Sequence, residues 1–403
     1  MPEDAPIGAE LILPQLCSEA ARLLAAVDHP RHAALLPLRQ ARLAKLGAVT
    51  LPSGHPLLHS WEAWGTLPAT ARPDADGSIG ISPAATAAWR AQALAQGGTP
   101  QLGSADAYLQ AAARATRSGI DGVVPNVWPI DVFEPCWSLY TLHLAELFAH
   151  PALIDTVQPI VAQIDARMSV RGLGPALHFA ADADDTAVAL CVLHLAGRKP
   201  TADALRQFES GALFVTFPGE RNPSVSTNIH VLHALRLLGR PADGASAYVQ
   251  AQRNLRGLWD NEKWHVSWLY PTAHALAALS QAQPQWRDER ALAGLLQAQR
   301  DDGGWGAGSG STLEETAYAL FALHAMDERE EPQGRRRIAQ AVARALDYML
   351  ARYAPGAPTQ IPLWIGKELY CPVRVVRVTE LAGLWLAHRW GCRSPEHAAE
   401  AAP

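Results

Sequence analysis

The sequence predicts an all-α protein built from paired helices. Apolar residues recur at positions i, i+3 and i+4 in many segments, which is the spacing of an amphipathic helix. Short stretches containing Gly and Pro separate these segments, and strand-like alternation is scarce. The predicted helices are 11–26, 84–96, 107–115, 136–149, 187–196, 231–238, 273–282, 292–299, 316–326 and 338–353.

The length and composition favour two helical domains. The chain has 403 residues, of which 49% are apolar and 18% are charged, so two hydrophobic cores are feasible. The net charge of −5 argues against nucleic acid or an anionic membrane surface as a partner. No segment is apolar over the length that a transmembrane helix needs, and the acidic start Met1-Pro-Glu-Asp lacks the basic region of a signal peptide.

The cysteines predict a reducing environment. They show neither a CxxC pair nor the spacing of metal ligands, so we expect free thiols and a cytoplasmic protein. The cysteines are Cys17, Cys136, Cys191, Cys371 and Cys392.

A weak internal repeat indicates how the helices are joined. Residues 299–306 form a Gly-rich loop that contains Trp305 and precedes a predicted helix, and residues 76–80 are a degenerate copy before another helix. In such a loop Gly provides the turn and the aromatic ring packs beneath it. We therefore expect the loops to connect helix ends in an α/α barrel.

The segment 178–187 is the strongest candidate for chemistry. Asp182, Asp184 and Asp185 fall within four residues and precede an apolar run, which predicts a loop-to-helix junction. Carboxylates this close cannot all ionise easily, and a carboxylic acid that stays neutral in an apolar pocket can donate a proton. A helix cap or a solvated acidic loop is the alternative, and a helix N-terminus itself favours ionised Asp.

The same segment resembles the signature of a known enzyme family. Residues 182–187 match the DxDDTA motif of class II terpene cyclases. Further segments resemble copalyl diphosphate synthases: 58–62 their LHSLEG, 124–134 their VPNVxPxDLFE, 262–264 their DKW, and 363–370 their WIGKxLY. The matches occur in family order over roughly residues 8–392, and the chain resembles bacterial copalyl diphosphate synthases of the ent type.

The resemblance implies an acid-initiated cyclisation. Asp184 would protonate the terminal alkene of geranylgeranyl diphosphate, and Asp182 and Asp185 would tune that acid. Two ring closures would then give a bicyclic diphosphate of the copalyl type. In the ent series, residues matching His59 and Asn126 hold a water molecule that removes the final proton.

The diphosphate is retained in this class, so cations must hold it. The resemblance suggests Lys263, Arg42 and Lys367 as candidates, with Mg²⁺ as a further partner of the diphosphate. The metal-binding residues remain unidentified. There is no DDxxD motif, since Asp301-Asp302 is followed by Gly-Gly-Trp, and this argues against ionisation of the diphosphate.

Aromatic faces can stabilise the moving positive charge. The chain has 13 Trp, and core packing is the alternative use for each ring. The candidates, chosen because they lie near the motif segments, are Trp61, Trp128, Phe133 and Trp268.

The resemblance also predicts the domain organisation. Residues 1–150 would form a shortened γ-type domain, because the N-terminal segment usual in the family is not recognisable. Residues 151–392 would form a β-type α/α barrel that carries Asp184, and 393–403 a disordered tail. The substrate pocket would lie between the domains. A homo-oligomer and a downstream class I terpene synthase acting on the product are further expectations.

Other functions remain open from the sequence. A farnesyl diphosphate cyclase that makes a drimane-type product would keep every motif. A triterpene cyclase would need two complete barrels, and a protein prenyltransferase subunit would need a zinc site whose spacing is absent. A non-catalytic α/α scaffold is the alternative from a different class.

Overall fold

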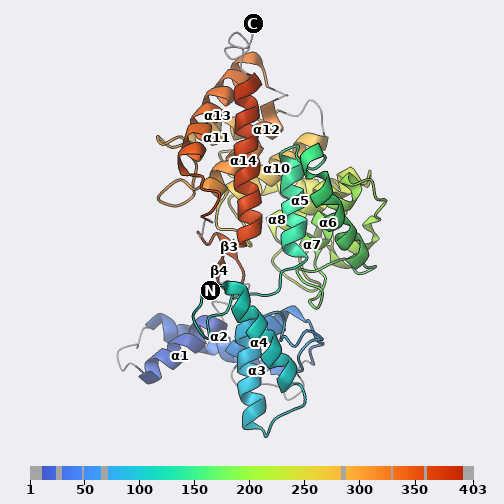
Figure 1. Ribbon diagram of the computed structural model, residues 1–403, viewed down its shortest axis with the longest axis vertical. Coiled ribbons are helices and arrows are strands. Elements are labelled where there is room, and N and C mark those ends of the chain that lie inside the picture. Colours follow the sequence, from blue (N-terminus) through green and yellow to red (C-terminus); the bar gives the residue numbers. More distant parts are fainter. Residues whose placement is uncertain are drawn as a thin grey trace. The chain divides into compact units, whose positions relative to one another are not determined.

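The computed structural model describes residues 11–23, 30–47, 50–64, 71–282, 287–327, 330–357 and 361–393. Helices joined by turns, with only two-residue strands, make up these residues, which confirms the all-α prediction (Figure 1). The chain forms two compact units. The N-terminal unit comprises Met1–Asp131, Pro175–Ala180 and Gly366–Glu368, and the barrel unit comprises Val132–Gly174, Ala181–Ile365 and Leu369–Pro403.

The boundary between the units falls after Asp131, earlier than the predicted residue 150. The helix that follows this boundary packs within the barrel unit, which is why the boundary moves. Whether the two units are γ- and β-type domains stays a prediction. Most of the predicted tail, residues 394–403, lies outside the described residues.

The N-terminal unit is a small helical assembly around an aromatic core. Its core includes Leu58, Trp61, Trp64, Ile79 and Trp89, all of which are buried. Its helices are α1 (Leu13–Leu23), α2 (Pro30–Gly47), the 3-10 helix η2 (Pro56–Ala63), α3 (Pro83–Ala95) and α4 (Leu102–Thr116).

Six helices of the barrel unit close into a ring within the described residues. Around the ring, each helix contacts the next and the last contacts the first, which confirms the predicted α/α barrel. In ring order they are α5 (Phe133–Leu144), α7 (Ala183–Leu195), α8 (Val225–Leu237), α10 (Leu269–Ala282), α12 (Leu313–Asp327) and α14 (Val373–Arg393).

An outer layer of helices packs on this ring. Helix α6 contacts α5 and α7, α9 contacts α8, α11 contacts α12, and α13 contacts α12 and α14. The outer helices are α6 (Ile154–Arg167), α9 (Asp243–Ala251), α11 (Glu289–Gln297) and α13 (Pro332–Arg352). Short 3-10 helices and strand pairs complete the unit: η3 (Pro151–Leu153), η4 (Ala202–Phe208), β1 (Glu209–Ser210) with β2 (Leu213–Phe214), and β3 (Trp364–Ile365) with β4 (Leu369–Tyr370).

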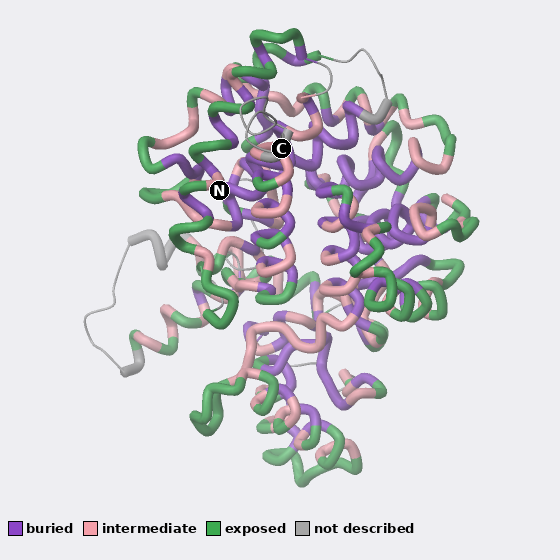
Figure 2. The backbone as a smooth tube through the Cα atoms, turned by 45° about the horizontal axis from the view of Figure 1, so that its top comes forward, coloured by how far each residue is buried: buried purple, intermediate pink, exposed green. Residues whose placement is uncertain are grey.

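Burial distinguishes the two layers. Residues 183–193, 225–235 and 314–323 on α7, α8 and α12 are buried without interruption. Such helices are covered on all sides, by the ring interior and by the outer layer, so they show little amphipathicity. Figure 2 shows these long buried stretches in purple, with exposed turns in green around them.

The Gly-rich loop repeat recurs more often than the sequence suggested. In each copy, a side chain in the first turn of a helix accepts the backbone N–H of a buried residue in the preceding loop, at 2.8–3.1 Å. The pairs are Ile79 with Thr86, Leu173 with Thr186, Phe214 with Asn228, Trp259 with Thr272 and Trp305 with Thr316. Both predicted copies are confirmed, and three were missed.

The N-terminal ends of the inner helices lie together. Asp184, in the first turn of α7, contacts His230 on α8. Glu314, in the first turn of α12, contacts Trp364, which precedes α14. The ring of Trp364 in turn packs against Phe133, the first residue of α5. One end of the barrel therefore gathers the residues that begin the inner helices.

Candidate active site

The Asp-rich segment forms the N-cap and first turn of α7. Asp182 is the N-cap, and its side chain accepts the backbone N–H of Asp185 at 2.7 Å. The preceding loop is fixed because Asp182 N donates to Leu173 O at 2.9 Å and Ala183 N donates to Thr216 O at 3.0 Å. The predicted loop-to-helix junction is therefore present, and the capping role belongs to Asp182.

Asp184 begins a chain of buried hydrogen bonds. It is 7% exposed, and its Oδ1 lies 2.6 Å from Nδ1 of His230 on α8. Nε2 of His230 lies 2.8 Å from Nδ1 of His274 on α10. Both imidazoles are buried, and Nε2 of His274 has no hydrogen-bond partner among the described residues. Burial lowers the pKa of His274 well below its usual value, so this ring is neutral.

Asp182 and Asp185 form a carboxyl pair beside the acid. Burial, opposed by hydrogen bonds from Asp185, raises the pKa of Asp182 to about 7. Burial and the charge of Asp182 raise the pKa of Asp185 well above its usual value. The expected proton retention therefore belongs to this pair, whose two carboxyl groups share a side-chain hydrogen bond.

Aromatic side chains surround the histidine pair. The rings of Trp137 and Tyr140 meet His230 edge-to-face at 5.7 and 5.4 Å between centroids. Tyr270 lies 4.4 Å from His274, and its hydroxyl accepts Trp137 Nε1–H at 3.0 Å. This wall offers π faces to a cation and keeps the surroundings of the acid apolar.

A second buried carboxylate, Glu314, lies at the same end of the barrel. Its Oε1 accepts Trp364 Nε1–H at 2.9 Å and the hydroxyl of Tyr318 at 3.2 Å. His265 Nε2 lies 3.4 Å from the same oxygen. Oε2 is buried and has no partner among the described residues. The inner end of the barrel therefore carries Glu314 in addition to the Asp-rich turn.

His59, in the N-terminal unit, has a defined tautomer. Its Nδ1 lies 2.7 Å from Gly80 O, and since a carbonyl can only accept, Nδ1 carries the proton. Desolvation and the charge of Lys367 lower the pKa of His59 to about 3, although the bond to Gly80 opposes this. His59 is therefore neutral at physiological pH, with a lone pair on Nε2.

The segment that contains Asn126 is anchored to the same turn as His59. Trp128 N donates to Ile81 O at 3.0 Å, next to the carbonyl of Gly80 that His59 binds. The Tyr108 hydroxyl also donates to Trp128 O. Asn126 is half-buried on this anchored loop. The structure thus brings the two predicted base segments to one turn of the N-terminal unit.

The Glu262-Lys263-Trp264 segment lies at the N-terminal end of α8. Glu262 accepts the backbone N–H groups of Ser226, Lys263 and Trp264 at 2.7–2.9 Å, although burial raises its pKa. The ammonium of Lys263 pairs with Glu220 and lies 4.9 Å from the Trp264 ring. Lys263 is partly exposed, so its charge is fixed near the surface of the barrel end.

The other two cation candidates differ in their surroundings. Lys367 is 7% exposed at its side chain, and its ammonium donates to Glu62 at 2.6 Å, Ser82 at 2.5 Å and His59 O at 3.0 Å. All three donors are therefore in use. Arg42 lies on α2 and is half-buried.

The four aromatic candidates occupy unlike positions. Phe133 packs against the aromatic side chains around the histidine pair, with 4.4 Å between its ring centroid and that of Trp137. Trp61 is buried against Trp64 in the N-terminal core, with 5.3 Å between ring centroids. Trp128 packs on Tyr108 at 5.4 Å, and Trp268 is half-buried just before α10. Among the described residues, Phe133 is the candidate with a ring contact to the aromatic side chains around the histidine pair.

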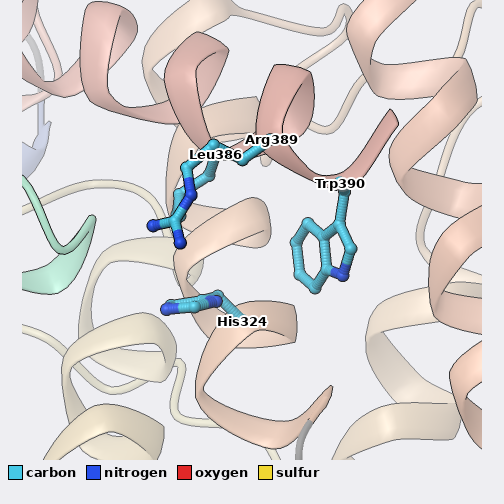
Figure 3. A pocket seen from close by; sticks show the side chains of 4 residues that line it. All are labelled: His324, Leu386, Arg389 and Trp390. Atoms are coloured by element: carbon cyan, nitrogen blue, oxygen red, sulfur yellow. The ribbon is translucent and has the colours of Figure 1, made fainter. Parts of the chain in front are cut away.

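Two hollows in the described part of the chain lie away from the acid. A hollow of about 10 Å³ lies among His324, Leu386, Arg389 and Trp390 (Figure 3), too small for more than a water molecule. A hollow of about 360 Å³ in the N-terminal unit is lined by Trp61, Arg72, Trp89 and residues between Gln92 and Gln101. Neither includes Asp184, so the hydrogen bonds and burial, not these hollows, identify the site.

In the described part of the chain, no three His, Cys, Asp or Glu side chains are grouped so that they could hold a metal ion. The described helices also include none with the length and apolarity to span a bilayer. None of the described cysteines, Cys17, Cys136, Cys191 and Cys371, takes part in a disulfide.

Sequence reasoning missed most of the wall around the acid. His230, His274, Tyr270 and Glu314 come from three different helices, and their sequence neighbours form no recognisable motif. One signal was available: polar residues within otherwise uninterrupted apolar helices, such as His230 and His233 on α8, mark the face that lines the ring.

Comparisons with known proteins agree with this arrangement. The chain is 80% identical over 404 residues to an uncharacterised protein of Sinorhizobium fredii, covering 100% of this chain and 78% of that protein. It is 33% identical over 402 residues to (+)-kolavenyl diphosphate synthase of Herpetosiphon aurantiacus, covering 95% and 76% respectively. No protein-family model matches the chain.

A solved structure gives the same result. The ent-copalyl diphosphate synthase from Streptomyces platensis matches with a TM-score of 0.77 and 32% identity, covering 95% of this chain and 77% of that one. The chain belongs to the class II terpene cyclases. It is an enzyme of the diterpene cyclase type.

Proposed function

We propose that this enzyme cyclises geranylgeranyl diphosphate to a bicyclic copalyl-type diphosphate of the ent series and leaves the diphosphate intact. The observation that carries the proposal is the buried contact between Asp184 and His230 at the N-terminal end of α7. A carboxylic acid backed by an imidazole in an aromatic enclosure suits protonation of an alkene.

Asp184 is the proposed acid, with the donated proton on Oδ2. His230 Nδ1–H would then donate to Oδ1, and His274 Nδ1–H would donate to His230 Nε2, which is consistent with the two distances. As the proton leaves, the bond from His230 becomes charge-assisted and stabilises the carboxylate. The alkene carbon gains the proton, and the tertiary cation is captured by the next two double bonds in turn.

The proposed base is a water molecule held by His59 and Asn126. His59 offers an unprotonated Nε2 because Nδ1 donates to Gly80 O. Its low pKa is no obstacle, because a carbocation releases its proton even to a weak base. The water takes the proton as the new alkene forms, so the overall reaction is an isomerisation.

The diphosphate is proposed to be held by Lys263 and Arg42. Lys263 exchanges its present partner Glu220 for phosphate oxygens in this proposal. Mg²⁺ would neutralise the diphosphate through phosphate oxygens and water, which does not require a cage of protein ligands. The product keeps its leaving group, so a class I terpene synthase is the kind of enzyme that would consume it.

Mass spectrometry of dephosphorylated products from geranylgeranyl diphosphate and farnesyl diphosphate tests the proposal. The wild-type enzyme should convert the C20 substrate to a bicyclic alcohol in preference to the C15 substrate. Asp184→Asn should lower this rate by about 10³-fold or more, given the size of general acid effects, with unchanged melting. His59→Ala should add a hydroxylated bicycle, because water gains access to the cation. Release of pyrophosphate by the wild type, or near-normal turnover by Asp184→Asn, contradicts the proposal.

A drimane-type product from farnesyl diphosphate is the second candidate. Every residue of the acid, base and diphosphate groups would act in the same way on the shorter chain. Preferred turnover of the C15 substrate in the same experiment would select this alternative.

A further inference from the structure

Glu314 occupies a position in the ring that corresponds to that of Asp184. Asp184 is the second residue of α7, and Glu314 is the second residue of α12. In the ring order α5, α7, α8, α10, α12, α14, two helices separate α7 from α12 in either direction. The two carboxyl groups therefore start opposite inner helices at the same end of the barrel.

The Glu314 carboxyl group is buried without a resident counter-charge. It is 0% exposed, and the described residues supply no Lys or Arg to pair with it. Trp364 Nε1–H and the Tyr318 hydroxyl donate to Oε1, and His265 lies at 3.4 Å. The donors therefore converge on one oxygen, while Oε2 stays buried and without a partner among the described residues.

The neighbouring glutamate shows that the fold does not require this arrangement. Glu315 Oε1 accepts Ala307 N–H at 2.7 Å, and its Oε2 accepts the Thr312 hydroxyl at 2.8 Å. Glu315 thus closes the loop before α12 with both oxygens. Glu314 takes no part in that loop, so loop closure does not account for its burial.

The donors to Glu314 belong to the aromatic wall. The Trp364 ring lies 5.5 Å from Phe133 and 5.1 Å from Tyr270, and Tyr270 in turn lies 5.4 Å from Tyr318. A hydrogen bond from an indole N–H or a phenol O–H to a carboxylate pushes electron density into the ring. The ring faces then attract a cation more strongly.

We propose that Glu314 supplies the counter-charge of the carbocation: its carboxylate polarises Trp364 and Tyr318, whose ring faces stabilise the positive charge formed during cyclisation. The inference rests on the proposed function. An unpaired buried carboxylate is costly in the resting enzyme, and a cation in the aromatic enclosure would offset that cost. Glu314 acts through the two rings and is in this sense a positioning residue.

Paired substrate analogues measure this effect without turnover. One is geranylgeranyl thiolodiphosphate, whose hydrocarbon is neutral; the other carries a protonated tertiary amine in place of a carbon that becomes cationic. Binding is measured by calorimetry in an Asp184→Asn background, so that the acid does not pair with the amine. Glu314→Gln should weaken binding of the amine analogue about tenfold, or about 1.4 kcal/mol. It should weaken binding of the neutral analogue less than about twofold.

Controls separate this effect from a structural one. Glu315→Gln should lower the melting temperature and leave the ratio of the two affinities unchanged, whereas Glu314→Gln should leave melting unchanged or raise it. In the enzyme with Asp184 intact, Glu314→Gln should lower kcat with little change in KM.

The outcomes distinguish the two proposals. If both analogues bind and Glu314→Gln leaves their affinity ratio unchanged, the inference is wrong and the proposed function stands. If neither analogue binds the wild-type enzyme, the proposed function fails, and the inference fails with it.

Discussion

Carboxyl groups a few residues apart in this barrel acquire different properties from their surroundings. Asp182 accepts a backbone N–H as an N-cap, Asp184 faces an imidazole, and Asp185 is buried with one oxygen unpartnered. The sequence motif identified all three, because an N-cap and its first turn are local features. It did not reveal His230 or Glu314, because both come from other helices.

Asp185 should make folding stability fall as the pH rises. Its pKa is raised well above its ordinary value in the folded protein, so from about pH 4 upward, until the folded-state carboxyl group itself ionises, the folded state binds more protons than the unfolded state and the free energy of unfolding decreases. Asp185→Asn removes this titration. Between pH 5 and pH 8 the wild type should therefore lose on the order of 2 kcal/mol relative to the variant.

Urea denaturation of both proteins at pH 5, 6, 7 and 8 measures the difference. Histidines with lowered pKa values, such as His59 and His143, have the opposite effect below neutral pH, but both proteins contain them. Their contribution therefore cancels in the difference. Parallel curves for the two proteins would show that Asp185 is ionised in the folded state.

At the scale of helices and loops, periodicity predicted many elements but not all. Helices α2 and α6 each contain an internal proline, Pro37 and Pro159, which disguised them. The sequence pattern also did not reveal α9 or α14. The fully buried helices were found but with shifted ends, since a helix covered on all sides has no polar face to mark its limits.

The loop repeat predicts a specific glycine requirement. Gly303 has φ of +87°, and a Cβ there would lie 2.4 Å from the carbonyl oxygen of Arg344 on α13. Gly303→Ala should therefore lower the free energy of unfolding by about 2–4 kcal/mol, combining backbone strain with a clash. Gly308→Ala, in the same loop with nothing within 4 Å of its Cβ, is the matched control and should be nearly neutral.

Chemical denaturation of Gly303→Ala and Gly308→Ala tests this glycine requirement. Equal stability of Gly303→Ala and Gly308→Ala would mean that the loop relaxes away from α13. In that case the repeat would be a connection and not a rigid joint between helix layers.

For the whole molecule, the chain returns twice to the N-terminal unit. Residues 175–180 join it, with Ala180 N donating to Gly54 O at 3.0 Å, and residues 366–368 bring Lys367. The division into two helical units was predictable from length and motifs. The returns were not, since a tripeptide about three hundred residues from Glu62 has no local signature that indicates this contact.

Two roles are considered for Lys367: a structural contact within the N-terminal unit and a ligand of the diphosphate. Substitution of Lys367 can separate them. In the structural role, its buried ammonium donates hydrogen bonds to Glu62, Ser82 and His59 O. Lys367→Met would leave the Glu62 carboxylate unpaired, so the unfolding free energy should fall by about 2–4 kcal/mol. Exposed Lys45 on α2 provides the control, and Lys45→Met should change stability little.

The double variant Lys367→Met with Glu62→Gln should recover part of the lost stability, because both charges of the pair are then absent. Thermal unfolding and steady-state kinetics are measured on the same samples. If Lys367 instead holds the diphosphate, Lys367→Met should raise KM without lowering the melting temperature, and Glu62→Gln should not restore it. A raised KM at an unchanged melting temperature would therefore place Lys367 among the proposed diphosphate ligands. It would also mean that the contacts of Lys367 do not hold residues 366–368 in the N-terminal unit.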